Sequence, residues 1–299
     1  MTIAALETEG LTKRYGRRTA LSDTTMTIPA GRVVGLVGPN GAGKTTLLHL
    51  AVGLLEPTSG SISVLGDRPG SGPEALARVG FLAQESPLYS RLRIDDHLRA
   101  GAWLNPRWDA DFANARIAEL GLDPRQRAGT LSGGQRSQLA LTMAVAKRPD
   151  LLLLDEPVAA LDPLARREFL QTLMEVVAAQ SVSIVLSSHL ISDLERVCDY
   201  LVVLVGGRVA LSGDVDEILA THHLLSGPQR DPSSLPASQT VLEASHIGKQ
   251  STLLIRTTDP ILDPSWTVTP VTLDDIVLAY MKRARDGVPN APRGLAVAS

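Results

Sequence analysis

Residues 38–46 read GPNGAGKTT, and no other stretch constrains the fold of this chain as strongly. They match the pattern G-x-x-x-x-G-K-[ST], whose fixed positions here are Gly38, Gly43, Lys44 and Thr45. The apolar run 31–37 before them is typical of a strand, and residues 45–52 after them have helical character. The chain is therefore expected to contain a strand, a glycine-rich loop and a helix in direct succession.

Such a loop carries the groups that bind phosphates. Its backbone N–H groups can surround phosphate oxygens, Lys44 can neutralise β and γ oxygens, and the Thr45 hydroxyl can bind Mg²⁺. The loop residues expected at the nucleotide are Gly38, Pro39, Asn40, Gly41, Ala42, Gly43, Lys44, Thr45 and Thr46. The sequence thus predicts a nucleoside phosphate as ligand.

A second apolar run, 151–154, ends in two acids. It is expected to be a strand buried on both faces, as is 183–187. Asp155 is suited to hold Mg²⁺ through water, and Glu156 is suited to take a proton from an attacking water or to orient it. Apolar strands that end in acids are common, so this assignment depends on the phosphate loop in the same chain.

Strands that alternate with helices predict an α/β fold, a P-loop NTPase core with a parallel sheet. Residues 6–28 and 60–65 predict an antiparallel β-subdomain beside that core. After residue 85, charged residues mix with Leu, Ala and Trp, which predicts a helical subdomain over about 86–148.

The amino-acid composition changes again near residue 222, where the first domain, 1–222, is expected to end. A composition rich in Ser, Pro and other polar residues predicts a linker over 223–240. A small α/β appendage is expected over 241–286, with an amphipathic helix at 273–285. Residues 287–299 are expected to be a disordered tail.

Net charge and apolar runs limit the partners. At a formal charge of −3 the chain has no general basic field, which weighs against a nucleic-acid partner. A single cysteine, Cys198, expected to be buried and unreactive, and the lack of a leader pattern at the N-terminus fit the cytosol. The longest apolar runs, such as 200–205, fall short of the roughly 18–20 residues that cross a bilayer, so a membrane role requires a separate membrane partner.

Residues 131–135, LSGGQ, form a second candidate anion site. Ser132 can cap a helix predicted over 133–147, and Gln135 follows at the spacing of a capping box. Gly133 and Gly134 let a ligand approach the backbone at this helix N-terminus. One chain therefore offers two phosphate-binding elements.

The phosphate loop, LSGGQ and LLLLDEP, in that order, resemble the nucleotide-binding domain of ATP-binding cassette (ABC) proteins over roughly residues 5–220. The resemblance implies ATP and Mg²⁺ as cofactors. It also implies that Tyr15 stacks on adenine, that Gln84 senses Mg²⁺ and the attacking water, that Asp162 lies in a loop between subunits, and that His189 contacts the γ-phosphate. Taken singly, these are more often a packing tyrosine, a solvated glutamine, an Asp-Pro turn and a structural histidine.

The family resemblance explains the two phosphate-binding elements. In ABC proteins two nucleotide-binding domains face each other head to tail, so the LSGGQ helix of one covers ATP on the other. This implies that Ser132, Gly133, Gly134 and Gln135 serve the partner's nucleotide. A second nucleotide-binding subunit is therefore expected, and the intact motifs favour a homodimer that closes on ATP and opens after hydrolysis.

A transporter ATPase of this kind acts at the cytoplasmic face of the cell membrane with a transmembrane permease. The permease is expected to press on the segment between Gln84 and Leu131. There Tyr89, Trp103 and Trp108 are either anchors for the permease or packing of the segment's own core.

The direction of transport is expected to be export. The sequence VTLDDIVLAYMKRA, from Val271, resembles a helix common at the C-terminus of export ATPases, and LNPRWD, from Leu104, is similar to stretches in bacterial exporter-type ATPases. Two alternatives are a soluble ABC ATPase of translation or DNA repair and a P-loop kinase or GTPase. The first would need two cassettes or a long coiled coil, and the second has no use for 132–135.

Overall fold

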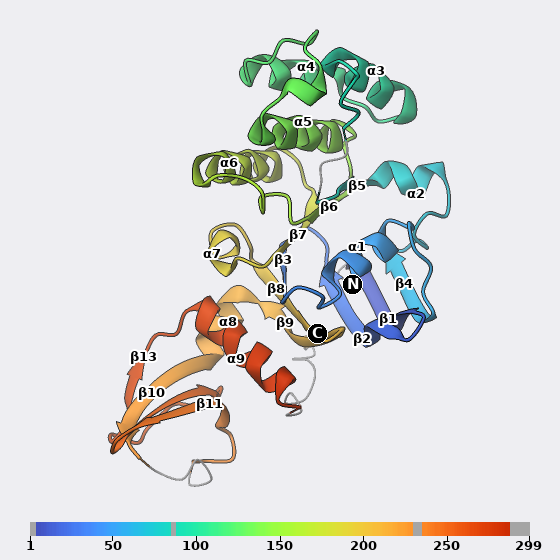
Figure 1. Ribbon diagram of the computed structural model, residues 1–299. Helices are drawn as coiled ribbons and strands as arrows, with labels where there is room; N and C mark the ends of the chain where they lie inside the picture. Colours follow the sequence, from blue (N-terminus) through green and yellow to red (C-terminus); the bar gives the residue numbers. More distant parts are fainter. Residues whose placement is uncertain (1–3, 85–87, 230–234, 288–299) are drawn as a thin grey trace.

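The computed structural model describes residues 4–84, 88–229 and 235–287 (Figure 1). Its centre is a six-stranded sheet in the order β5-β6-β7-β3-β8-β9, in which only β9 is antiparallel to its neighbour. The strands are β5 (Val79–Leu82), β6 (Leu151–Asp155), β7 (Ser183–Ser188), β3 (Val33–Val37), β8 (Tyr200–Val205) and β9 (Arg208–Asp214). The α/β class with a parallel core is confirmed.

An antiparallel sheet stands beside the central one, as the sequence predicts. Its order is β2-β1-β4, with β1 (Ala4–Tyr15), β2 (Arg18–Pro29) and β4 (Ser59–Val64). Helix α1 (Lys44–Ala51) follows the phosphate loop, and α2 (Pro73–Arg78) leads into β5.

The helical subdomain lies between β5 and β6 in sequence. It comprises α3 (Ile94–Leu104), α4 (Ala110–Glu119), the short 3₁₀ helix η1 (Ala128–Thr130) and α5 (Gly133–Ala146). Ile94, Ile117 and Leu139 meet in a core of its own. The predicted capping box opens α5: Gln135 N donates to Ser132 Oγ at 3.2 Å, and Ser132 N donates to Gln135 Oε1 at 3.0 Å.

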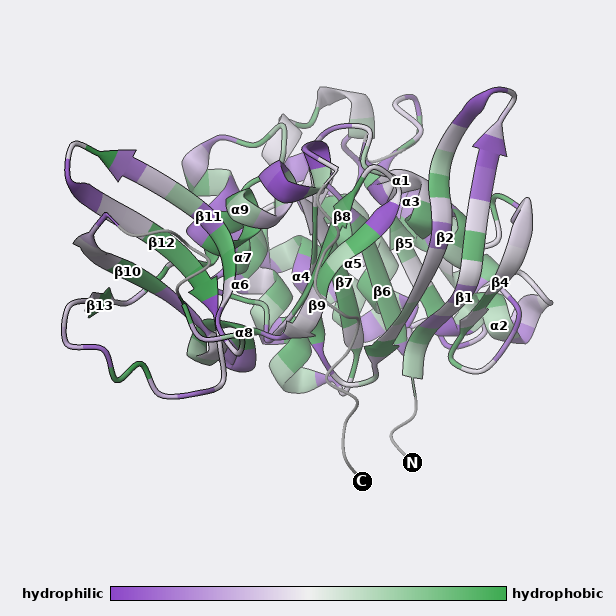
Figure 2. Ribbon diagram, turned by 90° about the horizontal axis from the view of Figure 1, so that it is seen from below, coloured by the Kyte–Doolittle hydropathy of each residue, from purple (hydrophilic) through white to green (hydrophobic). Residues whose placement is uncertain are grey.

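The two faces of the central sheet pack against different layers. In β3, Val34 and Leu36 face the core shared with α1 and the antiparallel sheet. Val33 and Val37 point the other way, into the core shared with α5 and with α6 (Pro163–Ala179). Figure 2 shows β6, β7 and β8 green along most of their length, whereas β1 and β2 alternate in colour. Helices α1 and α5 therefore lie on opposite faces of the sheet.

Helix α7 (Ile191–Leu194) packs closely on β3. A Cβ at Gly35 would lie 3.2 Å from both Cys198 Sγ and Leu194 Cδ1, so the glycine permits the approach. Cys198 is buried, and burial raises the pKa of its thiol well above the usual range. The prediction of a buried, unreactive cysteine is consistent with this environment.

The C-terminal part corrects the predicted linker. After α8 (Val215–Thr221), residues 223–228 of the predicted linker belong instead to β10 (His222–Pro228), which pairs with two strands that follow much later in the chain. The sheet order is β11-β12-β10-β13, with β11 (Thr240–Ile247), β12 (Gln250–Arg256) and β13 (Thr267–Thr269). Linker residues 230–234 and tail residues 288–299 lie outside the described part of the chain.

The expected C-terminal helix forms as α9 (Leu273–Arg285), with the bounds that the sequence predicts. It is not confined to an appendage, because Leu273, Ile276 and Val277 join the core that contains Leu194 and Leu201 of the first domain. Helix α9 contacts α7 and β8 on one side and β11 on the other, so it joins the C-terminal sheet to the first domain.

His222 joins β10 to α9. Its Nδ1 lies 2.7 Å from Ile218 O, so Nδ1 carries the proton and donates, which leaves Nε2 to accept from the Tyr280 hydroxyl at 3.2 Å. The pKa of His222 is lowered from 6.5 to about 4, chiefly because burial disfavours the charged imidazolium.

We expect this histidine to make the protein less stable in acid. Between pH 6.5 and 4 the unfolded chain binds a proton at residue 222 that the folded chain excludes, so stability is lost as the pH falls, by about 3 kcal/mol in full. Urea unfolding across this range should show a flatter pH dependence for His222→Gln than for the parent chain. Equal slopes would contradict the assignment.

Candidate functional site

The carboxyl ends of the parallel strands bring the predicted residues to one edge of the sheet. Gln84 follows β5 and His189 follows β7. Asp155 is the last residue of β6, and Glu156 comes directly after it. The phosphate loop follows β3, the neighbour of β7 in the sheet. In an open parallel sheet, ligands bind outside the carboxyl ends of the strands.

Two glycines of the loop are required by close backbone contacts. A Cβ at Gly38 would lie 2.2 Å from Leu204 O. Gly43 has a left-handed backbone, with φ of +106°, and a Cβ there would lie 2.6 Å from Ala20 O. Any side chain at these positions would displace the loop from β8 and β2.

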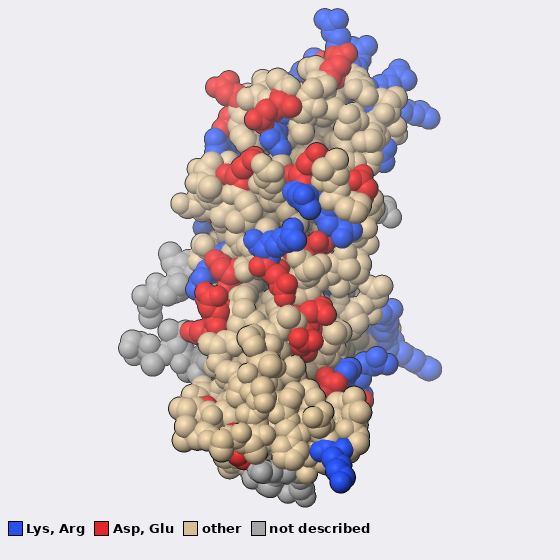
Figure 3. Space-filling view, turned by 90° about the vertical axis from the view of Figure 1, so that its left-hand side faces the viewer, with Lys and Arg blue, Asp and Glu red and all other residues tan. Residues whose placement is uncertain are grey.

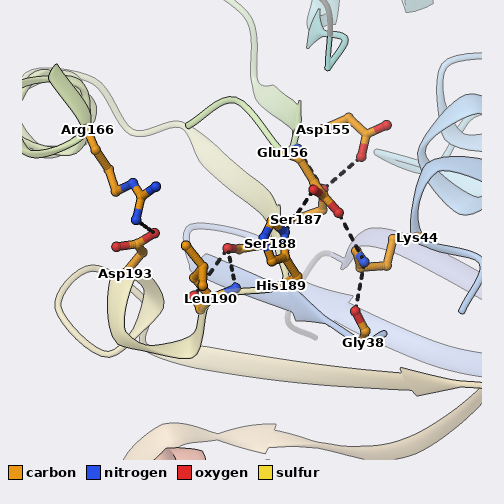
Figure 4. Close-up of polar contacts among 10 residues, drawn as sticks. All are labelled: Gly38, Lys44, Asp155, Glu156, Arg166, Ser187, Ser188, His189, Leu190 and Asp193. Atoms are coloured by element: carbon orange, nitrogen blue, oxygen red, sulfur yellow. Dashed lines mark hydrogen bonds and ion pairs between the residues drawn. The ribbon is translucent and has the colours of Figure 1, made fainter. Parts of the chain in front are cut away.

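Lys44 lies at the base of the loop, with 5% of its side chain exposed. Its Nζ donates to Gly38 O at 2.8 Å and forms an ion pair with Glu156 Oε1 at 3.2 Å (Figure 4). The lysine therefore joins the phosphate loop to Glu156, which follows β6.

Glu156 is held by contacts on several sides. Its carboxylate meets Lys44 through Oε1, and Oε2 lies 3.0 Å from His189 Nδ1. Its backbone is left-handed, with φ of +46°, which residues other than glycine rarely adopt. Its N–H donates to Ser187 Oγ at 2.9 Å, which helps to fix this conformation.

Ser187 is a member of the site that the sequence reading missed. Its hydroxyl donates to Asp155 Oδ1 at 2.8 Å while it accepts from Glu156 N, so one serine orients both acids. Asp155 itself is buried. The sequence shows only a serine at the end of an apolar strand. The pairing of β7 with β6 is what places this serine beside Asp155.

The oxygen donors present fit a small, hard cation. A Thr45 hydroxyl, the Asp155 carboxylate and the Gln84 amide are ligand types that Mg²⁺ accepts. Among the described residues, no cluster of three or more His, Cys, Asp or Glu side chains is arranged to hold a metal ion. Mg²⁺ is usually held by one or two carboxylates together with substrate phosphates, so the donor set suits a metal that arrives with a nucleotide.

The LSGGQ entrance lies apart from the phosphate loop of the same chain. It opens α5, which packs on the face of the sheet opposite α1 (Figure 1). A Cβ at Gly134 would lie 3.1 Å from Ala165 Cβ, and Asp162 caps α6 by accepting from Ala165 N at 3.0 Å. The entrance is therefore next to the Asp162 turn. Within the described ranges, no hydrogen bond or ion pair joins residues 132–135 to residues 38–46.

The turn between β1 and β2 approaches the phosphate loop from the other side. Tyr15 ends β1 with 47% of its surface exposed. Arg18 Nη2 lies 3.2 Å from the position of a Cβ at Gly41, which places this arginine beside the loop. The sequence does not predict Arg18 as a site residue, because nothing in the residues around it indicates that it lies beside the phosphate loop.

The chain is similar in sequence to several known proteins. The family model "ABC transporter" matches residues 21–159. The thiamine import ATP-binding protein ThiQ of Salmonella typhimurium (strain LT2) is 34% identical over 66% of this chain and 86% of its own. The Nod factor export ATP-binding protein I of Cupriavidus pinatubonensis is 34% identical over 72% of this chain and 68% of its own. The chain belongs to the ABC transporter family. It is an ATP-binding subunit and an ATPase.

A solved structure gives the same result for the fold. The ATP-binding subunit of an ABC transporter superimposes with a TM-score of 0.64 at 32% identity, over 72% of this chain and 91% of that one. ABC ATP-binding subunits work with transmembrane permeases. Within the ranges 4–84, 88–229 and 235–287, no helix of this ABC subunit combines the length and apolar character that spanning a bilayer requires.

Tyr89, Trp103 and Trp108 take different positions in this ABC subunit. Trp108 is partly buried and packs against the core of the helical subdomain, and a Cβ at Gly101 would lie 2.4 Å from its ring. Trp103 and Tyr89 are 86% and 75% exposed, and Leu104 next to Trp103 is also exposed. The packing interpretation therefore suits Trp108 better, whereas Tyr89 and Trp103 are available at the surface.

Proposed function

We propose that this subunit hydrolyses Mg-ATP at sites shared between two copies of the chain and thereby drives export through a transmembrane permease. The observation that carries the proposal is the position of Glu156, bridged to Lys44 on one side and to His189 on the other. A carboxylate, an ammonium and an imidazole at the mouth of a phosphate loop suit phosphoryl transfer to water.

In this proposal the loop residues 38–46 bind the phosphates through their N–H groups, and Tyr15 stacks on the adenine. Lys44 turns from Glu156 toward the β and γ oxygens, since a phosphate in the loop offers it a more highly charged partner. Thr45, Asp155 and Gln84 would hold or sense Mg²⁺, which would supply charge neutralisation at the γ-phosphate.

Glu156, once released from Lys44, faces the γ-phosphate as the group that orients or deprotonates water. His189 contacts the γ-phosphate and, through Nδ1, keeps the Glu156 carboxylate in place. Ser187 fixes the positions of the Asp155 carboxylate and the Glu156 backbone relative to each other.

Ser132, Gly133, Gly134 and Gln135 would serve a nucleotide on a second copy, with Asp162 beside them. The separation of α5 and α1 on opposite faces of the sheet supports a two-chain site. The contacts exist only in the closed pair with a γ-phosphate present, so ATP favours closure and ADP does not. Each charge-assisted hydrogen bond contributes about 1.5–3 kcal/mol, and several at two sites shift the equilibrium strongly.

The shared site makes the rate depend on protein concentration. We expect the rate of ATP hydrolysis per chain to rise steeply with the concentration of the purified protein, because only pairs of chains are active. Light scattering during turnover would give the fraction of pairs. Full turnover in a preparation that stays monomeric would contradict the proposal.

Export at the cytoplasmic face of the membrane is supported by the similarity to a Nod factor export subunit and by α9. The equal identity to a thiamine import subunit makes direction the part to test. Inside-out vesicles that carry this chain and its permease should take up substrate when ATP is added outside. ATP-driven uptake by right-side-out vesicles loaded internally with ATP would instead indicate import.

Trp103 is expected to anchor the permease. Trp103→Ala should weaken binding of the chain to permease-containing vesicles by about thirtyfold or more, the effect of losing a central aromatic anchor worth about 2 kcal/mol. ATP hydrolysis without the permease should be unchanged. Leu262 has the same exposed fraction, 86%, but lies in the C-terminal unit. Leu262→Ala is therefore a matched control, and equal effects of the two changes would contradict the assignment.

A further inference from the structure

A groove of about 320 Å³ lies between α6 and α7, outside the site described above. Helix α6 follows Asp162, and α7 follows His189, so the groove is bounded by two helices that leave the proposed catalytic site. Its volume is at the lower end of the range of small-molecule sites, roughly 300–1,000 Å³.

The groove carries positive charge in a chain of negative net charge. Arg166, Arg167 and Arg196 line it, with Asp193 as the only acid. Figure 3 shows basic side chains at mid-height of this face, with acidic side chains above and below them. An anion in the groove would therefore meet a local excess of positive charge.

Two of these arginines are available to a ligand. Arg166 Nη1 pairs with Asp193 Oδ2 at 3.5 Å (Figure 4). Within the described part of the chain, the side chains of Arg167 and Arg196 take part in no hydrogen bond or ion pair, and the buried Nε of Arg166 has no hydrogen-bond partner. Guanidinium groups with free donors are well suited to bind carboxylates and phosphates.

The floor of the groove is apolar. Leu170 and Met174 of α6 and Val197 after α7 line it. Burial of an aliphatic group there would be favourable, because it removes apolar surface from water. A bare inorganic anion would leave this surface unused.

We propose that the groove binds an amphiphilic anion, a phosphate or carboxylate head carried on a short aliphatic group. The head pairs with Arg167 and Arg196, and the aliphatic part lies on Leu170 and Met174. The ligand also reaches Arg166, which otherwise joins Asp193 on α7 to the carbonyl of Leu161 before the Asp162 turn.

This last contact connects the groove to catalysis, a step that rests on the proposed function. An anion that draws Arg166 from Asp193 loosens the tie between the Asp162 turn and the helix after His189. We therefore infer that occupancy slows ATP hydrolysis. The binding step itself needs no ATP turnover, so the two parts are tested separately.

Binding is tested by calorimetry on the full chain with hexyl phosphate as probe, with MgADP present to occupy the phosphate loop. We expect one site per chain, with inorganic phosphate and hexanol each binding at least about tenfold more weakly. The double change Arg167→Ala and Arg196→Ala should weaken binding by at least about tenfold. Arg125→Ala is the matched control, because Arg125 is an exposed arginine of the helical subdomain.

Three results would overturn the groove as a binding site: equal affinity for inorganic phosphate, equal loss in the Arg125→Ala chain, or binding that only Lys44→Ala removes. The effect of the groove on catalysis is tested by ATP turnover with and without hexyl phosphate. Slower turnover in the parent chain but not in the double variant supports this coupling, and unchanged turnover at full occupancy overturns it. If the parent chain hydrolyses no ATP, the proposed function fails while the binding result stands.

Discussion

Replacing Glu156 by glutamine is expected to slow ATP hydrolysis by a factor of about 10²–10⁴ while ATP still binds. Glutamine keeps the shape of the side chain and can still accept from His189, but it cannot take a proton from water. It also removes the negative charge that pairs with Lys44 at 3.2 Å, so the lysine is free for the phosphates. Closed, ATP-bound pairs should therefore accumulate.

The measurement is single-turnover hydrolysis together with sizing of the protein in Mg-ATP. Glu74→Gln is a matched control, because Glu74 is an exposed glutamate in the first turn of α2, a helix outside the site. Rapid turnover in the Glu156 variant would remove this residue from the role of base. A loss of ATP binding would show that the carboxylate supports the loop instead.

Ser132→Arg is expected to abolish pairing in ATP while ATP still binds to the single chain. The phosphate loop and Ser132 belong to helices on opposite faces of the sheet, so a long cation at Ser132 leaves the chain's own loop undisturbed. Across the pair it would fill the space meant for the partner's γ-phosphate. ATP hydrolysis should then fall to the level of an isolated chain.

The arginine also removes the N-cap of α5, which costs about 1 kcal/mol of stability on average. Thr272→Arg is the control for this cost, because Thr272 caps α9 with the same reciprocal bonds, to Asp275. Both variants should lose similar stability, yet only the Ser132 variant should fail to pair. Much weaker ATP binding by the Ser132 variant as a monomer would contradict the two-chain site.

Several local features were predictable from the sequence because their causes are local. The spacing Ser132 to Gln135 defines a capping box within one turn, and the box is present. Gly38 and Gly43 stand where a tight loop needs them. The apolar run 151–154 is long enough to mark a buried strand, and the helix over 273–285 has the predicted bounds.

Other features depend on neighbours that are distant in sequence. Residues 223–228 lead into the Ser- and Pro-rich stretch that predicted a linker, but they form a strand because β12 and β13 supply backbone partners on both sides. Trp108 packs closely on α3 only because Gly101 leaves room for its ring. Ser187 acquires its role from the pairing of β7 with β6.

By itself the sequence determined the phosphate loop, the capping box at Ser132 and the alternation of strands and helices in the core, since turn chemistry and periodicity act over a few residues. Only the tertiary structure decided that Glu156 stands between Lys44 and His189, and that α5 faces away from α1. These relations follow from the order of strands in the sheet, which places carboxyl ends side by side whatever their separation along the chain.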